Sequence, residues 1–321
     1  MAHQVENMAY VGQTPWHGLG NTLEHGQPLE VWADQAGMNW EIERSPAQFI
    51  IGSEGHYMGE LKNVPERNVL YRSDTKAPLS IVSDRYNVVQ PREILEFYRD
   101  LTEVSGFELE TAGVLKEGKK LWALARTGQS ATIKGNDVTN GYVLLATACD
   151  GSMATTAQFT SVRVVCNNTL AIALKGHSNG TVKVPHSTIF DADNVKRQLG
   201  ISVSGWDEFI YRLKTLSDRK VKHHEAKQFI HRVFNDPTKE CLPRANERAM
   251  QAVTNLFEGK GRGSTLESAN GTAFGLLNSI TEFVDHDRRA RNNDYRLDSA
   301  WFGQGASIKQ RALDEAILLV A

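Results

Sequence analysis

The sequence predicts an α+β protein, in which an antiparallel sheet with flanking helices is followed by a helical C-terminal part. Two observations carry this prediction. Six of the nine prolines lie within the first 91 residues and none occurs from 92 to 184, where proline would interrupt sheets and helices. From Asp191 onward, apolar residues recur mainly at helical spacing. We therefore expect an α+β domain over 1–190 and a helical domain over 191–321.

The first 90 residues are expected to be rich in loops, because proline and glycine interrupt every longer apolar run. Residues 1–30 are predicted to be irregular. A short helix is expected over 29–37, short strands around 40–42, 49–51 and 69–71, and extended chain over 81–89.

A helix over about 91–104 is predicted next. Pro91 suits the first helical position, and Ile94, Leu95, Tyr98 and Leu101 form one apolar face. Strands are then expected over 107–115, 121–126, 141–149 and 152–159, with a polar loop at 127–139 and a tight turn at Asp150-Gly151.

Residues 162–173 favour a helix, or a passage from strand to helix, that begins near Asn167 or Asn168. The helical part follows. We predict helices over about 191–199, 205–218, 224–234, 244–257, 272–286 and 306–320, with Trp301 and Phe302 in a loop before the last of them.

Composition excludes several classes of protein. Hydrophobic residues make up 40% and charged residues 23% of the 321 residues, as in an average globular protein rather than a disordered one. No apolar run reaches the ~18 residues of a membrane helix, so no membrane partner is expected. Three widely spaced cysteines and a start without an export signal favour reduced thiols in a cytosolic protein. No cofactor motif occurs, and we expect no cofactor.

Charge is unevenly distributed along the chain. Residues 1–130 hold 12 Lys and Arg against 18 Asp and Glu, and residues 131–321 hold 24 against 20. A nucleic-acid partner should therefore meet the C-terminal part, although ordinary solvated faces would give the same totals.

The clearest basic feature lies between Arg219 and Arg232. On a helix that starts near residue 220, one face carries Lys220, His224, Lys227 and His231, and the opposite face carries Ala226, Phe229, Ile230 and Val233. Such a face would attract phosphates, or would simply be the solvated side of an amphipathic helix.

Further candidate contacts to nucleic acid are scattered along the chain. Lys260 and Arg262 lie in a glycine-rich segment that could wrap a phosphate backbone or could simply be a linker. It lacks the spacing of a nucleotide-binding P-loop. Arg163 and Asn167 lie at the helix start expected near residue 167. The free backbone N–H groups of a helix start could bind a phosphate there, or the side chain of a capping Asn could accept their hydrogen bonds. Tyr86 could stack on a base or pack in a turn. The set is completed by Arg288 and Arg289.

The same region offers candidate metal ligands. Asp285, His286 and Asp287 could hold a divalent ion. Alternatively, the charged residues of this segment could simply interact with the dipole at the C-terminal end of a helix. We therefore carry a metal-dependent, nuclease-like enzyme as an alternative to a protein without catalytic activity.

Several strings together resemble a known family. In order, they are WHGLG at 16–20, VSDRYNVVQP at 82–91, DGS at 150–152, RVVCNNTL at 163–170, and GTAFGLLN at 271–278 running into TEFVDH at 281–286. Their spacing resembles the phage/plasmid-like "domain of unknown function 932" family over roughly residues 10–320. The resemblance implies a protein carried by phages, prophages and plasmids, with no settled activity and no catalytic residues to transfer.

The element order over 91–173, a helix, a strand meander and a helix, is similar to the core of phage single-strand annealing proteins. That likeness implies binding of single strands in a basic groove and assembly into homo-oligomers. The leading hypothesis is thus a single-stranded DNA-binding protein that promotes annealing or recombination. A third hypothesis is an interaction protein that acts against host defence.

Overall fold

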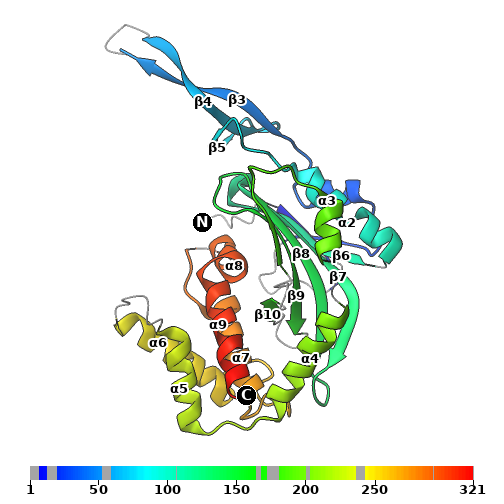
Figure 1. The fold of residues 1–321 in the computed structure, drawn as a ribbon, viewed down its shortest axis with the longest axis vertical. Helices are drawn as coiled ribbons and strands as arrows, with labels where there is room; N and C mark the ends of the chain where they lie inside the picture. The colour runs from blue at the N-terminus through cyan, green and yellow to red at the C-terminus, as the bar shows by residue number, and fades with distance from the viewer. Residues whose placement is uncertain are drawn as a thin grey trace. The chain divides into compact units, whose positions relative to one another are not determined.

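The structure is a computed structural model. It describes residues 7–12, 20–52, 59–105, 107–163, 168–171, 181–199, 203–235, 243–291 and 293–320. The chain is a mixed α+β protein with mostly antiparallel sheets in its N-terminal half and helices α4–α9 in its C-terminal part, which confirms the predicted fold class (Figure 1).

The backbone divides into two compact units. The first comprises residues 1–125, 144–157 and 182–196, and the second comprises 126–143, 158–181 and 197–321. The expected domain boundary at residue 190 stays a prediction. Each unit is described by itself below.

The larger sheet has the strand order β10-β9-β8-β7-β6-β1-β2, with β11 pairing to β9. Its strands are β1 (Asn7–Val11), β2 (Asn21–Leu23), β6 (Glu108–Leu115), β7 (Lys120–Thr132), β8 (Val138–Ala148), β9 (Thr155–Arg163), β10 (Asn168–Ala171) and β11 (Thr181–Val184). A short 3₁₀ turn, η1 (Lys116–Gly118), joins β6 to β7. The meander expected after the first long helix is therefore present.

Three expectations about this sheet are wrong. The first 30 residues are not wholly irregular, because β1 pairs with β2 in parallel and with β6 in antiparallel orientation. The polar loop expected at 127–139 is mostly strand, since β7 continues to Thr132. Within 162–173, Asn168–Ala171 form strand β10 against β9, so pairing with a neighbouring strand, rather than a helix cap, satisfies this backbone.

In the first unit, two helices pack together and cover buried aromatic residues. They are α1 (Leu29–Gln35) and α2 (Pro91–Ser105), both close to their predicted bounds. Trp32, Phe97 and Tyr98 are almost fully buried. The Tyr98 hydroxyl donates to the Ala123 carbonyl at 2.7 Å, so this ring satisfies its polar atom inside the core.

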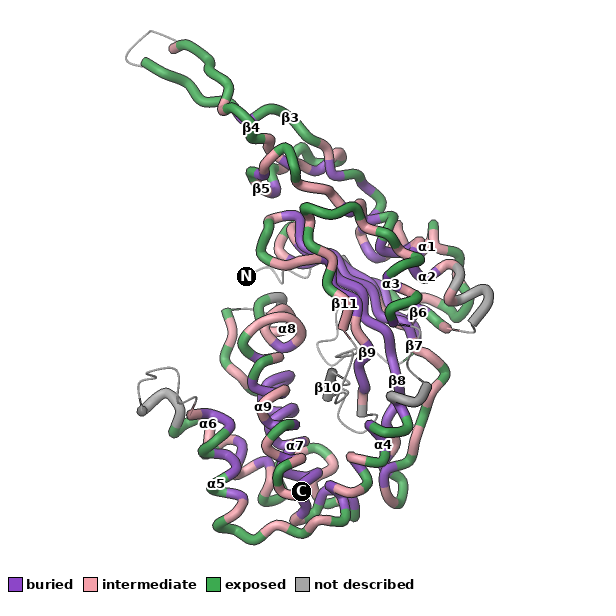
Figure 2. The backbone as a smooth tube through the Cα atoms, viewed as in Figure 1, coloured by how far each residue is buried: buried purple, intermediate pink, exposed green. Residues whose placement is uncertain are grey.

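A second sheet of the first unit has the order β3-β4-β5 and is antiparallel. Its strands are β3 (Ile42–Ile51), β4 (Glu60–Arg72) and β5 (Pro78–Ser83), which are longer than the short strands expected here. The hydrophobic periodicity of the sequence underestimates the length of these strands, because β3 and β4 are largely exposed and carry no regular alternation of buried and exposed residues (Figure 2).

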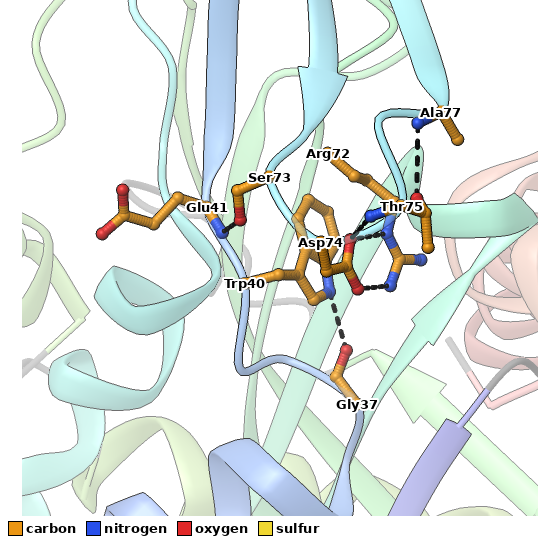
Figure 3. A network of polar contacts seen from close by, with 8 residues as sticks. All are labelled: Gly37, Trp40, Glu41, Arg72, Ser73, Asp74, Thr75 and Ala77. Carbon is orange, nitrogen blue, oxygen red and sulfur yellow. Dashed lines mark hydrogen bonds and ion pairs between the residues drawn. The ribbon is translucent and has the colours of Figure 1, made fainter.

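The base of this sheet is held by a buried arginine. Arg72 is 7% exposed, lies 4.3 Å above the Trp40 ring and donates to both carboxylate oxygens of Asp74, at 2.9 and 2.7 Å (Figure 3). The Asp74 carboxylate also accepts from the Thr75 backbone N–H at 2.7 Å, and Trp40 donates to the Gly37 carbonyl at 2.8 Å. Together these bonds fix the turn between β4 and β5.

This network predicts a pH-dependent contribution to stability. The hydrogen bond from Arg72 lowers the pKa of Asp74 from 3.8 to about 2. Because the folded-state pKa is depressed, the contribution is complete above pH ~4 and is lost as pH falls through about 2. Asp74 is 40% exposed, so solvent screening limits the contribution to about 1 kcal/mol.

The expected result is that Asp74→Asn lowers the free energy of unfolding in urea at pH 6 by up to that amount, and that the gap to wild type narrows between pH 4 and pH 2. A gap that is the same at every pH would show that the Asp74 charge is not what stabilises the turn.

The second unit is built around α7. The helices are α4 (Val203–Asp218), α5 (His223–Phe234), α6 (Pro243–Asn255), α7 (Ala273–Glu282), α8 (Asn293–Phe302) and α9 (Gln304–Leu318), with π-helical turns η2 (Leu256–Lys260) and η3 (Phe283–Asp287), and α3 (Ala192–Leu199) precedes them. Helix α7 is buried along nearly its whole length and contacts α4, α6 and α9. Trp301 and Phe302 end helix α8, so the loop expected there is wrong.

Candidate nucleic-acid interface

The basic segment before α5 is held in an extended form by the start of α7. Val221 N–H donates to the Gly271 carbonyl at 2.9 Å, and Ala273 N–H donates to the Arg219 carbonyl at 2.9 Å. Lys220 lies in a bridge opposite Thr272. Helix α5 therefore begins at His223 and not near residue 220, because backbone pairing occupies the preceding residues.

Helix α5 has the two faces that the sequence predicts. Ala226, Phe229, Ile230 and Val233 are buried, and Lys227 is exposed, as are His224 and His231. Burial of one face against the rest of the unit leaves the cationic face in solvent.

The single acidic residue of this segment is engaged locally. Residues 219–235 hold five Lys and Arg and only one acid, Glu225. The Glu225 carboxylate accepts from Lys222 N–H at 2.8 Å and from the Arg219 guanidinium at 2.7 Å, and these two bonds lower its pKa. Glu225 thus caps the helix and pairs with Arg219, and it forms no ion pair with the exposed lysines of this segment.

The π-helical turn η2, which leads into the glycine-rich segment, contacts the start of α5. His223 Nδ1 lies 3.5 Å from a Glu258 carboxylate oxygen, two residues before the exposed Lys260. Arg262 N–H donates to both carboxylate oxygens of Glu282, at 3.0 and 2.9 Å, and Glu282 is only 5% exposed. A buried carboxylate therefore anchors the backbone of this segment to the end of α7.

Four exposed lysines lie on these joined segments, and we call them the basic patch: Lys220, Lys222, Lys227 and Lys260. The Lys220 ammonium donates to the neutral Asn270 carbonyl at 2.9 Å. Within the described part of the chain, none of the four makes an ion pair. Lys222 was not among the predicted residues, and its position just before a capped helix start is the signal that could have found it.

Two other predicted arginines lie beyond η3 and differ in accessibility. Arg288 is half-buried, donates to the Ser299 hydroxyl at 2.6 Å and to the Gln304 side-chain carbonyl, and burial lowers its pKa. Arg289 is exposed. The Arg288 guanidinium is thus committed to α8 and α9, whereas Arg289 faces solvent.

The candidate metal ligands do not form a compact set. Asp285 is 7% exposed and accepts from the Lys309 ammonium at 2.7 Å, and Asp287 is exposed. His286 is buried beside them in the chain. Among the residues that the structure describes, no group of three or more His, Cys, Asp and Glu side chains is placed to hold a metal ion.

The remaining predicted contacts belong to other parts of the chain. Tyr86, in the first unit, stacks on the His186 ring with centroids 4.4 Å apart, and its hydroxyl donates to the Ala148 carbonyl at 2.7 Å. Burial raises the pKa of Tyr86. The backbone of Arg163 ends β9, its side chain is outside the described residues, and so is Asn167.

Fold and site together define a two-unit α+β protein with a lysine patch on its helical part, and no helix in the described ranges is long and apolar enough to cross a membrane. The profile of the domain of unknown function family DUF932 matches residues 78–301, and the chain belongs to this family. Comparisons with curated proteins and with solved structures give no match.

Proposed function

We propose that the protein binds single-stranded DNA through the basic patch, in the bacterial cytoplasm, as a non-enzymatic component of a phage or plasmid that promotes annealing or recombination. The observation that carries the proposal is the set of four exposed lysines without an ion-pair partner among the described residues. Lysine ammonium groups that are free of acids can neutralise phosphates and release the counterions bound to them.

An exposed aromatic residue in the same unit is the candidate for stacking on the bases of a single strand. Tyr211 on α4 is 71% exposed, and its helix leads directly into Lys220. Because every base has an aromatic face, an exposed ring that stacks on bases adds affinity for single strands with little sequence preference. Tyr211 takes the role that the sequence suggested for Tyr86, whose ring already stacks within the first unit.

The test is a fluorescence-anisotropy titration of a labelled oligothymidine at several salt concentrations. The affinity of wild type should fall steeply with salt, and Lys227→Gln/Lys260→Gln should make the slope of log K against log salt shallower by about 1.4, or ~0.7 for each lost phosphate contact on a single strand. Lys183→Gln, which removes an exposed lysine of β11 in the first unit, serves as the matched control and should leave the slope unchanged.

A third variant separates stacking from charge. Tyr211→Ala should weaken binding by roughly fivefold or more without changing the salt slope. Equal losses for the patch variant and the Lys183 control, or no binding by wild type at micromolar concentration and low salt, would end the proposal.

A further inference from the structure

The far end of the β3–β4 hairpin is an exposed two-stranded arm. We call residues 48–51 of β3 and 60–63 of β4 the arm; Gln48 pairs with Asn63 and Ile51 with Glu60. Strand β5 pairs only with residues 67–71 of β4, so it does not reach the arm. In the first unit, the arm lies at the outer end of this sheet (Figures 1 and 2).

The arm exposes apolar side chains on both of its faces. Ile50 and Leu61 lie directly opposite each other and are each 57% exposed, and on the other face Phe49 and Ile51 are 47% and 49% exposed. A ribbon of only two strands is marginal in water, and natural sheets cover or charge their free edges. This arm therefore has the character of a surface that a partner covers.

A bulge separates the arm from the rest of the sheet. The register shifts between Pro46 and Gln48, and Glu66 has a φ of 55°, next to Pro65, which has no N–H to donate. Within the described residues, the outer edge formed by Gly59 and residues 60–63 of β4 has no strand beside it. An edge about five residues long is thus left open, close to the usual length of a strand.

The sequence along this edge is complementary to itself. If two copies of β4 run antiparallel about a two-fold axis at Leu61, Glu60 of each copy faces Lys62 of the other, and the two Leu61 side chains meet on the opposite face. Glu60 and Lys62 already form an ion pair within one chain, so both charges lie on the same face of the strand. Opposite charges directly across a strand pair stabilise it.

We propose that a second copy of this chain pairs with the arm, edge to edge along Gly59 and residues 60–63 of β4, and joins two hairpins into one four-stranded sheet. The apolar residues Ile50 and Leu61 then form a continuous row with their counterparts in the partner copy. This inference is independent of the proposed binding of DNA, because it concerns a different unit.

The charge of the arm argues against other occupants. Residues 46–63 contain two Glu and one Lys, so the arm has no cationic surplus for nucleic acid or for an anionic lipid surface. An isologous pairing, in contrast, matches Glu60 of each copy with Lys62 of the other.

Sedimentation analysis of the full chain over a range of concentrations tests the pairing. We expect a reversible dimer in wild type. Glu60→Lys and Lys62→Glu should each weaken it about tenfold, since either one places two like-charge pairs across the axis, and the double variant should restore it. Ile189→Ser, which removes a 76% exposed apolar residue elsewhere in the first unit, is the control and should leave the dimer intact.

A cysteine at the axis tests the register. Leu61→Cys should give a disulfide-linked dimer on a non-reducing gel, whereas Ile189→Cys should not. Burial raises the pKa of the native Cys149 thiol to about 12, which makes it unreactive. The Ile189→Cys control carries the same three native cysteines, Cys149, Cys166 and Cys241, so any cross-link through them would appear in both variants. A monomer at all concentrations would overturn the proposal. So would single charge variants that behave like wild type, or Leu61→Ser changing binding to lipid vesicles and not self-association.

Discussion

Replacing Gly275 with alanine is expected to destabilise the second unit by about 3 kcal/mol or more. Gly275 lies in the first turn of α7, and a Cβ atom there would lie 1.9 Å from the Ala269 carbonyl oxygen. That oxygen is part of a turn in which Ala269 accepts from Thr272 N–H at 3.2 Å, so it cannot move without opening the start of the helix. The free energy of unfolding in urea measures the loss.

The neighbouring helix cap provides the control. Thr272 accepts from Gly275 N–H at 3.0 Å and donates to the Ser268 carbonyl at 2.7 Å. Thr272→Ala removes both bonds without adding volume and should cost about 1–2 kcal/mol. If Gly275→Ala costs no more than Thr272→Ala, the close approach of the two segments is not what requires glycine.

Replacing Lys309 with methionine is expected to cost about 3–5 kcal/mol, because it leaves the Asp285 carboxylate buried without its cation. The Lys309 and Asp285 side chains are 6% and 7% exposed, and their charged atoms lie 2.7 Å apart. Water cannot replace the lost partner at that depth. The measurement is again the unfolding free energy in urea, with far-ultraviolet circular dichroism to show that the variant folds.

The double variant Asp285→Leu/Lys309→Met separates the charge from the packing. It removes both charges and keeps similar volume, and it should recover most of the stability. A double variant as unstable as the single one would indicate that the shape of this site, and not its ion pair, holds η3 against α9. The same result bears on the metal hypothesis, because it tests whether the Asp285 carboxylate is a structural group.

The spacing of apolar residues in the sequence was sufficient to predict the elements that bury one narrow, continuous face. Helix α2 begins at the predicted Pro91, and α5 buries the four residues expected on its inner face. In both, the 3.6-residue repeat coincides with one-sided burial, so periodicity carries the information.

Pairing between distant segments could not be predicted in the same way. The sequence around Asn168, the first residue of β10, suits an N-cap and predicts a helix start, but the ladder with β9 decides the conformation of this strand. For the long β3–β4 hairpin the sequence predicts only short strands, because apolar and polar residues do not alternate regularly along its exposed faces. Helical periodicity predicts Lys220 to lie on a helix, and no sequence rule links it to Thr272, 52 residues away, with which it forms a bridge.

The candidate site was predicted in its parts and not as a whole. The exposed lysines of α5 and η2 follow from composition and helical phase, but the contact between His223 and Glu258 that joins the two segments depends on tertiary packing. Likewise, charge counts could not show that Glu225 caps α5 and that Glu282 anchors the backbone of Arg262, so that neither forms an ion pair with the four lysines among the described residues.

Ultraviolet cross-linking of the full chain to a bromodeoxyuridine-substituted single strand, followed by peptide mass spectrometry, tests the central proposal most directly. If the basic patch is the binding surface, cross-linked peptides should come mainly from residues 205–235 and 256–272, and they should disappear at high salt. Cross-links that fall mainly in residues 1–125, or none at a concentration that saturates an established single-strand binder, would contradict it.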